Sequence, residues 1–136
     1  MIVVDANVIV YLVVRGPNTP AAKSVFKHDP YWRAPPLWRS EVRNALLGHV
    51  RWARLQFANA LEAMEYAERV LRAGEEAVDS RRVLELAVAS GRSAYDCEYV
   101  ALAEHLNVPL VTADRALLQA FPDTTRALDS FAPPES

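Results

Sequence analysis

Hydrophobic positions along this chain fall into short runs separated by longer segments of mixed polarity. Residues 2–5 and 108–112 are predominantly apolar and rich in β-branched side chains, which is typical of strands buried on both faces of a parallel sheet. Similar short stretches predict further strands at residues 31–35, 76–80 and 124–128. Residues 7–14 are ambiguous, because the run NVIVYLVV has the composition of a strand but follows a strand without a turn.

Most of the remaining chain shows helical spacing of apolar residues, with helix signals at the ends of the segments. Pro36 suits a first helical turn, whereas Gly74 and Gly91 suit positions that close a helix. These patterns predict helices over residues 18–27, 36–51, 55–72, 80–90, 93–106 and 114–120. Short strands alternating with longer helices predict an α/β fold, a three-layer sandwich with a mostly parallel central sheet flanked by helices. Residues 132–136 are expected to form a tail.

The composition limits the classes of protein to which the chain can belong. Its 136 residues are the usual size of one domain, so we expect a single domain over residues 1–136. A net charge of −2 excludes a uniformly basic nucleic-acid binder, although nearly all basic residues are Arg, which suits local phosphate contacts. The one cysteine, Cys97, excludes an internal disulfide and fits a reducing cytosol. No leader and no membrane-spanning run is expected, which favours a cytoplasmic protein.

Two aspartates stand where predicted strands end. Asp5 follows the apolar residues Ile2–Val4, and Asp114 comes two residues after the run PLVT. If these strands are parallel neighbours, both acids emerge at the same edge of the sheet, where ligand crevices form in open α/β folds. Each acid is also a suitable N-cap for the helix that follows it, so a structural interpretation stays open for both.

Two further acids lie on predicted helices. Glu41 shares a helical face with Trp38 and Ala45, where a carboxylate is costly unless it is paired or binds a metal. Its structural alternative is a salt bridge at the rim of the core. Asp96 also lies on an apolar face, but Ser93 stands three residues before it in a capping-box pattern. Helix capping is therefore the alternative for this acid.

Together the four acids predict a metal site. Carboxylates about 4–6 Å apart repel one another by about 3–4 kcal/mol per pair at an effective dielectric constant of about 20, so a cluster needs a cation or retained protons. Oxygen ligands alone favour Mg²⁺ or Mn²⁺ over zinc. Such ions typically serve phosphate chemistry, because they contact phosphate oxygens and activate water.

Four motifs, in order along the chain, support a family resemblance. They are VVDANVIVYL, SEVRNALL, SAYDCEYVALAEHL and LVTAD. With their spacing, they make the whole chain resemble the PIN-domain ribonucleases, specifically the VapC-type toxins of bacterial and archaeal toxin–antitoxin pairs. The resemblance implies a PIN-like fold in which residues 7–14 form a helix. It also implies an acidic quartet made of Asp5, Glu41, Asp96 and Asp114.

The resemblance assigns a role to each of these residues. Asp5 and Asp96 are the expected direct ligands of Mg²⁺ or Mn²⁺, and Asp114 is expected to complete the site directly or through water. Glu41 is expected to bind metal through water or to act as the general base on the attacking water. Two polar neighbours are expected to orient ligands or phosphate: Asn7 and Thr112.

The resemblance also implies an activity and partners. We expect a metal-dependent endoribonuclease that hydrolyses RNA phosphodiester bonds and acts as the toxin of a toxin–antitoxin pair. The implied protein partners are a second copy of the chain, in a homodimer, and an antitoxin that places a cationic side chain near the acids. Candidate RNA contacts, for which an ordinary polar helix face is the alternative, are Arg39, Arg43, Arg51, Trp52 and Arg54.

Two other functions compete with this hypothesis. A phosphatase of the haloacid-dehalogenase type also begins with an apolar strand ending in an aspartate. It usually carries a second Asp two residues later, where this chain has Asn7, and a later Lys, whereas this chain has no Lys after Lys27. The second alternative is a non-catalytic PIN-like scaffold that binds RNA or protein. An intact acidic cluster argues against a scaffold, which has no use for clustered repulsion.

Overall fold

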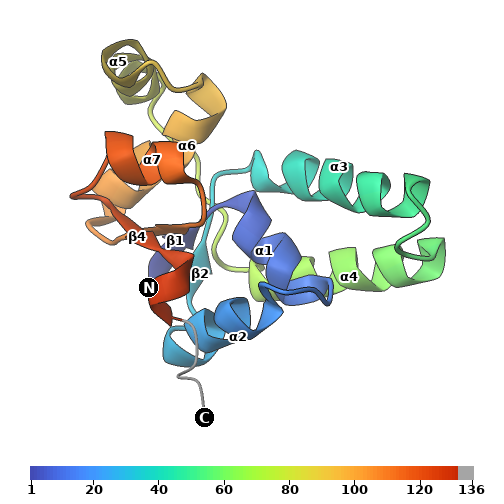
Figure 1. Cartoon of the computed structure of the whole chain (residues 1–136). Helices are drawn as coiled ribbons and strands as arrows, with labels where there is room; N and C mark the ends of the chain where they lie inside the picture. The colour runs from blue at the N-terminus through green and yellow to red at the C-terminus, as the bar shows by residue number, and fades with distance from the viewer. Residues whose placement is uncertain (132–136) are drawn as a thin grey trace.

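The computed structural model describes residues 1–131, and a parallel four-stranded sheet lies at its centre (Figure 1). The strands lie in the order β2-β1-β3-β4, and each neighbouring pair is parallel. Their bounds are Ile2–Val4 for β1, Trp32–Arg33 for β2, Leu110–Thr112 for β3 and Thr125–Ala127 for β4. The expected parallel sheet is therefore confirmed. The expected tail, 132–136, lies outside the described residues.

Helices cover both faces of the sheet. Their bounds are Ala6–Val13 for α1, Thr19–His28 for α2, Trp38–Arg51 for α3, Phe57–Val70 for α4, Ser80–Ser90 for α5, Ala94–Leu106 for α6 and Arg115–Ala120 for α7, followed by a 3-10 helix, η1, at Leu128–Phe131. Figure 1 shows α1–α4 on one side of the strands and α5–α7 on the other. The three-layer α/β sandwich is confirmed. Within residues 1–131, no helix combines the length and the apolar character that crossing a membrane needs.

The two central strands bring the ends of distant segments together. Val3 pairs with Leu110 and Val4 with Val111, and these four side chains are fully buried. Continuous apolar strands of this kind suit the middle of a parallel sheet, where helices cover both faces. Because β1 and β3 run in the same direction, the residues that follow them lie at the same edge of the sheet.

Residues 6–13 form a helix despite their β-branched composition, as the resemblance implied. Asp5 caps this helix by accepting the backbone N–H of Val8 at 3.1 Å. Val8, Ile9 and Leu12 are buried on the side that faces the core. Tertiary burial of such a face contributes more to helix stability than intrinsic propensity does, so it outweighs the local preference for a strand.

The strand predicted at residues 76–80 is wrong. Within residues 1–131, this part of the chain forms a single parallel bridge, between Ala34 and Glu75. The role expected for Gly74 also changes, because α4 already ends at Val70. A Cβ atom at Gly74 would lie 1.9 Å from the backbone oxygen of Trp32, so glycine is needed here for the chain to pass close to β2.

Candidate active site

Asp5 lies at the carboxyl end of β1 with only 7 % of its surface exposed. One carboxylate oxygen, Oδ1, caps α1, and the other, Oδ2, accepts a hydrogen bond from the hydroxyl of Thr112. Burial is the main cause that raises the pKa of Asp5 to about 6; the hydrogen bonds from Thr112 and Val8 lower it, and the charges of Asp114 and Glu41 raise it. The capping interpretation and the sheet-edge interpretation of Asp5 are thus both correct.

Asp114 follows β3 and is the N-cap of α7. Its Oδ1 atom accepts the backbone N–H groups of Ala116 at 2.8 Å and Leu117 at 3.4 Å. The hydroxyl of Thr112 accepts the backbone N–H of Asp114 at 3.0 Å while it donates to Asp5. One hydroxyl group therefore connects the acids at the ends of the two central strands.

Glu41 lies in the first turn of α3 and is half-buried. The hydroxyl of Tyr99 donates a hydrogen bond to its Oε1 atom at 2.6 Å. Burial is the main cause that raises the pKa of Glu41; the Tyr99 hydrogen bond lowers it, and the charge of Asp96 raises it. The salt bridge offered as a structural alternative is wrong, because the ion pairs among residues 1–131 do not include Glu41.

Asp96 lies in the first turn of α6 and is half-buried. Ser93 caps this helix by accepting the backbone N–H of Asp96 at 3.0 Å, as the capping-box pattern predicted. Burial and then the charge of Asp114 raise the pKa of Asp96, whereas the Ser93 hydroxyl and the charge of Arg92 lower it. Cap formation by Ser93 places the Asp96 carboxyl at a helix N-terminus, where the helix dipole favours an anion.

A pocket of about 250 Å³ brings these four acids together. Its lining residues are Asp5, Ala6, Asn7, Glu41, Asn44, Ala45, Asp96, Tyr99, Asp114 and Leu117. The acids come from the ends of β1 and β3 and from the first turns of α3 and α6, so the fold joins segments far apart in the sequence. Clustered carboxylates mark a candidate active site, and burial raises the pKa of three of them: Asp5, Glu41 and Asp96.

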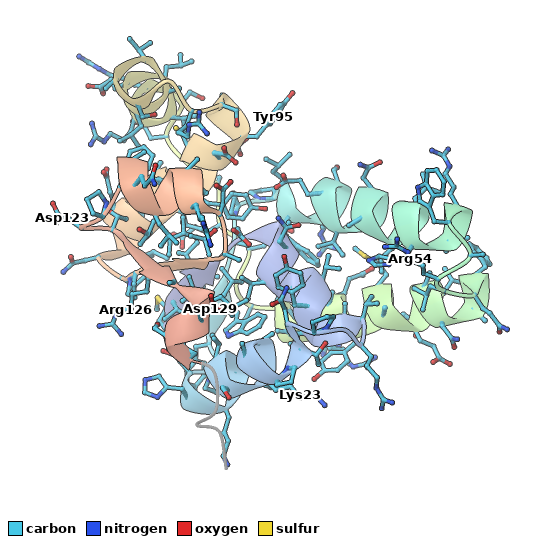
Figure 2. The ribbon with its side chains drawn as sticks, viewed as in Figure 1. Lys23, Arg54, Tyr95, Asp123, Arg126 and Asp129 are labelled. Atoms are coloured by element: carbon cyan, nitrogen blue, oxygen red, sulfur yellow. The ribbon has the colours of Figure 1, made fainter. Side chains whose placement is uncertain are left out.

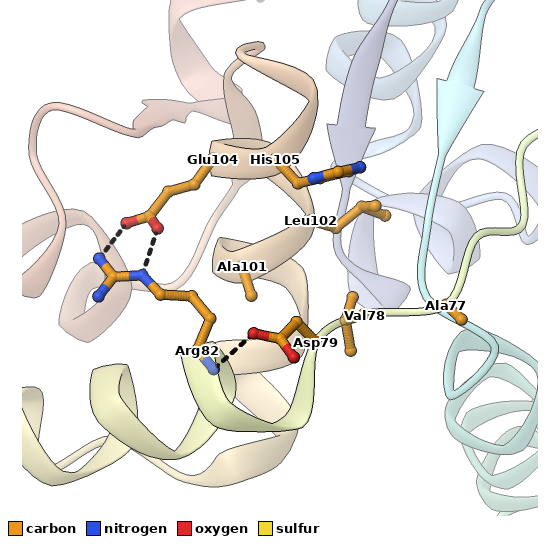
Figure 3. A pocket seen from close by; sticks show the side chains of 8 residues that line it. All are labelled: Ala77, Val78, Asp79, Arg82, Ala101, Leu102, Glu104 and His105. Atoms are coloured by element: carbon orange, nitrogen blue, oxygen red, sulfur yellow. Dashed lines mark hydrogen bonds and ion pairs between the residues drawn. The ribbon is translucent and has the colours of Figure 1, made fainter.

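A larger cavity, of about 590 Å³, lies elsewhere (Figure 3). It is lined by the segment that leads into α5 and by the second half of α6. Its charged side chains are committed to one another: the Nε and Nη2 atoms of Arg82 donate to the two carboxylate oxygens of Glu104 at 2.8 and 3.1 Å. Asp79 caps α5 through the backbone N–H of Arg82. Among the described residues that line this cavity there is no cluster of unpaired acids, so the candidate active site is the pocket at the sheet edge.

Comparisons with known proteins identify the family. A family model described as the PIN domain matches residues 2–121. This chain belongs to the PIN-domain family. It is 32% identical over 124 residues to Ribonuclease VapC3 of Pyrobaculum aerophilum, a match that covers 89% of this chain and 95% of the relative. The PIN domain described here is therefore of the VapC type.

The fold of this PIN domain is also found in a solved structure. The crystal structure of PAE2754 from Pyrobaculum aerophilum superposes with a TM-score of 0.74. The two sequences are 26% identical, and the match covers 96% of this chain and 92% of that one. The similarity thus extends over nearly the full length of both chains.

Sequence reasoning missed several residues that line the pocket of this PIN domain. Asn44 lies one helical turn after Glu41, and Tyr99 lies one turn after Asp96. Helical spacing alone could have indicated both as neighbours of the acids. The predicted neighbours are well placed: exposed Asn7 lines the pocket, and Thr112 contacts Asp5.

The side chains of the pocket have the chemistry that a hard divalent cation requires. All four acids offer oxygen atoms, which Mg²⁺ and Mn²⁺ prefer as ligands. Within residues 1–131, however, no three His, Cys, Asp or Glu side chains are arranged to hold a metal ion as they stand. Hydrogen-bond donors of the protein engage part of three of the carboxylates: Thr112 and Val8 at Asp5, Tyr99 at Glu41, and two backbone N–H groups at Asp114. The oxygen atoms of the pocket are therefore suitable ligands for Mg²⁺ or Mn²⁺, and binding the ion would require the carboxyl groups to move closer together.

The candidate RNA-binding residues lie on or just after α3 of the PIN domain, at different distances from the pocket. Arg39 is committed to ion pairs with Glu75 at 2.8 Å and Glu68 at 3.4 Å. Arg51 is ten residues after Glu41, which corresponds to about 15 Å along a helix axis. Figure 2 shows Arg54 at the end of the α3–α4 hairpin that is remote from the sheet. Four of the candidates are exposed: Arg43, Arg51, Trp52 and Arg54.

Proposed function

We propose that this PIN domain is a divalent-metal-dependent endoribonuclease that hydrolyses RNA phosphodiester bonds and serves as the toxin of a toxin–antitoxin pair. The observation that carries the proposal is the gathering of four acids in one pocket at the carboxyl edge of the sheet. Its similarity to Ribonuclease VapC3 supports RNA as the substrate. A binding scaffold would gain nothing from keeping a carboxyl group buried there with a raised pKa.

Each acid has a role in the proposed reaction. Asp5, Asp96 and Asp114 would hold Mg²⁺ or Mn²⁺. The bound ion would supply charge neutralisation at the phosphate and a water of lowered pKa. Glu41 would take the proton of the attacking water or hold water in the site.

Two polar residues would complete the site. The amide of Asn7, which is exposed and lines the pocket, would donate a hydrogen bond to a phosphate oxygen of the RNA. Thr112 would hold the Asp5 carboxylate in place, as its hydroxyl hydrogen bond already does. Contacts of the RNA chain beyond the cleaved bond would come from the exposed basic residues and Trp52 on and after α3.

The proposed function includes partners that restrain the activity. A free ribonuclease would damage the cytoplasm of its own host, so a cognate antitoxin would bind and inhibit the toxin. A cationic side chain of that partner, placed near the acids, would relieve the repulsion that a metal ion otherwise relieves. A homodimer is the proposed assembly of the toxin.

The decisive experiment compares cleavage with and without divalent ions. The purified chain, freed of antitoxin, should cleave RNA with Mg²⁺ or Mn²⁺ and lose this activity in EDTA. Asp5→Asn and Asp96→Asn should abolish cleavage while circular dichroism stays unchanged. Asp123→Asn is the matched control, because Asp123 is exposed on a turn outside the pocket (Figure 2). Full activity in EDTA would refute the metal dependence, and RNA binding without cleavage would favour the scaffold.

A further inference from the structure

Tyr99 connects two helices at the edge of the pocket. Its hydroxyl, on α6, donates to Oε1 of Glu41, on α3, across 58 positions of sequence. Only 3% of Tyr99 is exposed, so this hydrogen bond is shielded from water on the tyrosine side. Burial and the nearby carboxylates raise the pKa of Tyr99 well above its ordinary value, so the phenol keeps its proton and acts as a donor.

Glu41 depends on this contact more than the strand-end acids depend on any single donor. Asp5 is held by a backbone N–H and a hydroxyl, and Asp114 by two backbone N–H groups. Among the hydrogen bonds of residues 1–131, the one from the Tyr99 hydroxyl is the only one that the Glu41 carboxylate accepts. A glutamate side chain has several rotatable bonds, and fixing them costs conformational entropy that a charge-assisted hydrogen bond can offset.

The geometry leaves half of the carboxylate available. Oε1 of Glu41 is occupied by Tyr99, whereas Oε2 receives no hydrogen bond from residues 1–131. Both residues line the same pocket. Tyr99 also lies one helical turn after Asp96, so one face of α6 carries a proposed metal ligand and the anchor of a second acid.

We propose that Tyr99 is a positioning residue of the ribonuclease: its hydroxyl holds one oxygen of Glu41 so that the second oxygen stays directed to the attacking water. The proposal rests on the proposed function, because it assigns the way in which Glu41 is held for that reaction. Tyr99 itself touches neither substrate nor reacting atoms in this role.

The test removes only the hydroxyl. Tyr99→Phe keeps the buried ring, and Tyr95→Phe is the matched control on the same helix, because Tyr95 is 63% exposed (Figure 2). With Mn²⁺ and an oligoribonucleotide, we expect kcat of Tyr99→Phe to fall roughly 10- to 100-fold, as displacement of a reacting group by about 1 Å does, while KM is unchanged. Tyr95→Phe should match the wild type in both constants.

A double-mutant cycle shows whether Tyr99 acts through Glu41. In the Glu41→Ala background, Tyr99→Phe should cause no further loss of kcat, because the group that it positions is already absent. An independent loss of the same size in both backgrounds would overturn the proposal. The proposal would also be overturned if the wild type cleaves RNA and the Tyr99→Phe variant is equally active.

A second cycle measures the contact without any activity. Urea unfolding in EDTA of the wild type, both single variants and the double variant should show a non-zero coupling between Tyr99 and Glu41, whereas the cycle of Tyr95 with Glu41 should show none. Absence of coupling in the first cycle would overturn the proposal. A wild type that cleaves no RNA would refute the proposed function and the positioning role with it, and the stability cycle would still report whether the contact exists.

Discussion

The hydroxyl of Thr112, at the end of β3, donates a hydrogen bond to the carboxylate of Asp5, at the end of β1. The same hydroxyl accepts the backbone N–H of Asp114 at 3.0 Å. It thus fixes one acid directly and sets the path of the chain that carries the other. This arrangement is possible because β1 and β3 are parallel neighbours in register.

Replacing Thr112 by Val should weaken the site while preserving its shape. The substitution keeps the β-branched volume but removes the donor that lowers the pKa of Asp5, so a higher fraction of Asp5 retains its proton. Loss of a hydrogen-bond partner behind a metal ligand typically costs about 10- to 100-fold in metal affinity or activity. Calorimetric titration with Mn²⁺ and a cleavage assay would measure the loss. Thr124→Val, on the turn before β4, is the control, and an equal loss in both variants would contradict the role of Thr112.

The stability of the metal-free protein should depend on the protonation of Asp5. A pKa raised from 3.8 to about 6 means that the folded state binds this proton more tightly than the unfolded state does. The free energy by which the bound proton of Asp5 stabilises the folded state is therefore fully present below about pH 4. It is lost as the pH rises through about 6. At neutral pH the cost to the folded state is on the order of 3 kcal/mol.

Asp5→Asn should remove this dependence. In EDTA at neutral pH, we expect the variant to be more stable than the wild type by about 1–3 kcal/mol, with an advantage that shrinks toward pH 4. Urea unfolding at a series of pH values measures the difference, and Asp129→Asn, an exposed acid, should show no such trend. A difference that does not vary with pH would show that Asp5 is not held in the folded state with a raised pKa.

Asp114 has two roles that different substitutions separate. It caps α7 through two backbone N–H groups, and it lines the acidic pocket. Asp114→Asn keeps a capping oxygen and loses the charge, whereas Asp114→Ala loses both. We expect the unfolding free energy of Asp114→Ala to be lower than that of Asp114→Asn by about 0.5–2 kcal/mol, the usual contribution of an N-cap. Both variants should lose cleavage, and an active Asp114→Asn would assign Asp114 to capping alone.

The ends of the cleaved RNA report which oxygen attacks the phosphate. An activated water attacks without help from the ribose 2′-hydroxyl. The products should therefore carry a 5′-phosphate and a 3′-hydroxyl, which mass spectrometry of a short oligoribonucleotide distinguishes. Products with a 2′,3′-cyclic phosphate would show that the 2′-hydroxyl is the nucleophile and that the proposed mechanism is wrong.

Local sequence determined most of the elements and the sheet-edge position of two acids. Apolar runs of three or four residues predict β1 and β3, and Asp5 and Asp114 follow them because an unpaired charge is excluded from a buried strand. Cap residues also act within a few positions, so the helix over 80–90 and its Gly91 end were predicted from the sequence. These features depend on interactions between near neighbours in the chain.

Tertiary structure alone decided which distant groups meet. The contact between Glu41 and Tyr99 spans 58 positions, and the close passage of Gly74 past Trp32 depends on how α4 leads back to the sheet. Residues 6–13 became a helix because their apolar face is buried against the core. Residues 76–80 did not become a strand: they are mostly exposed, and the nearest strand pairing among the described residues is the bridge between Ala34 and Glu75. Short segments have weak preferences of their own, and burial against the rest of the fold is worth more than these preferences. No local pattern contains that information, because the partner surfaces are made by residues far away in the sequence.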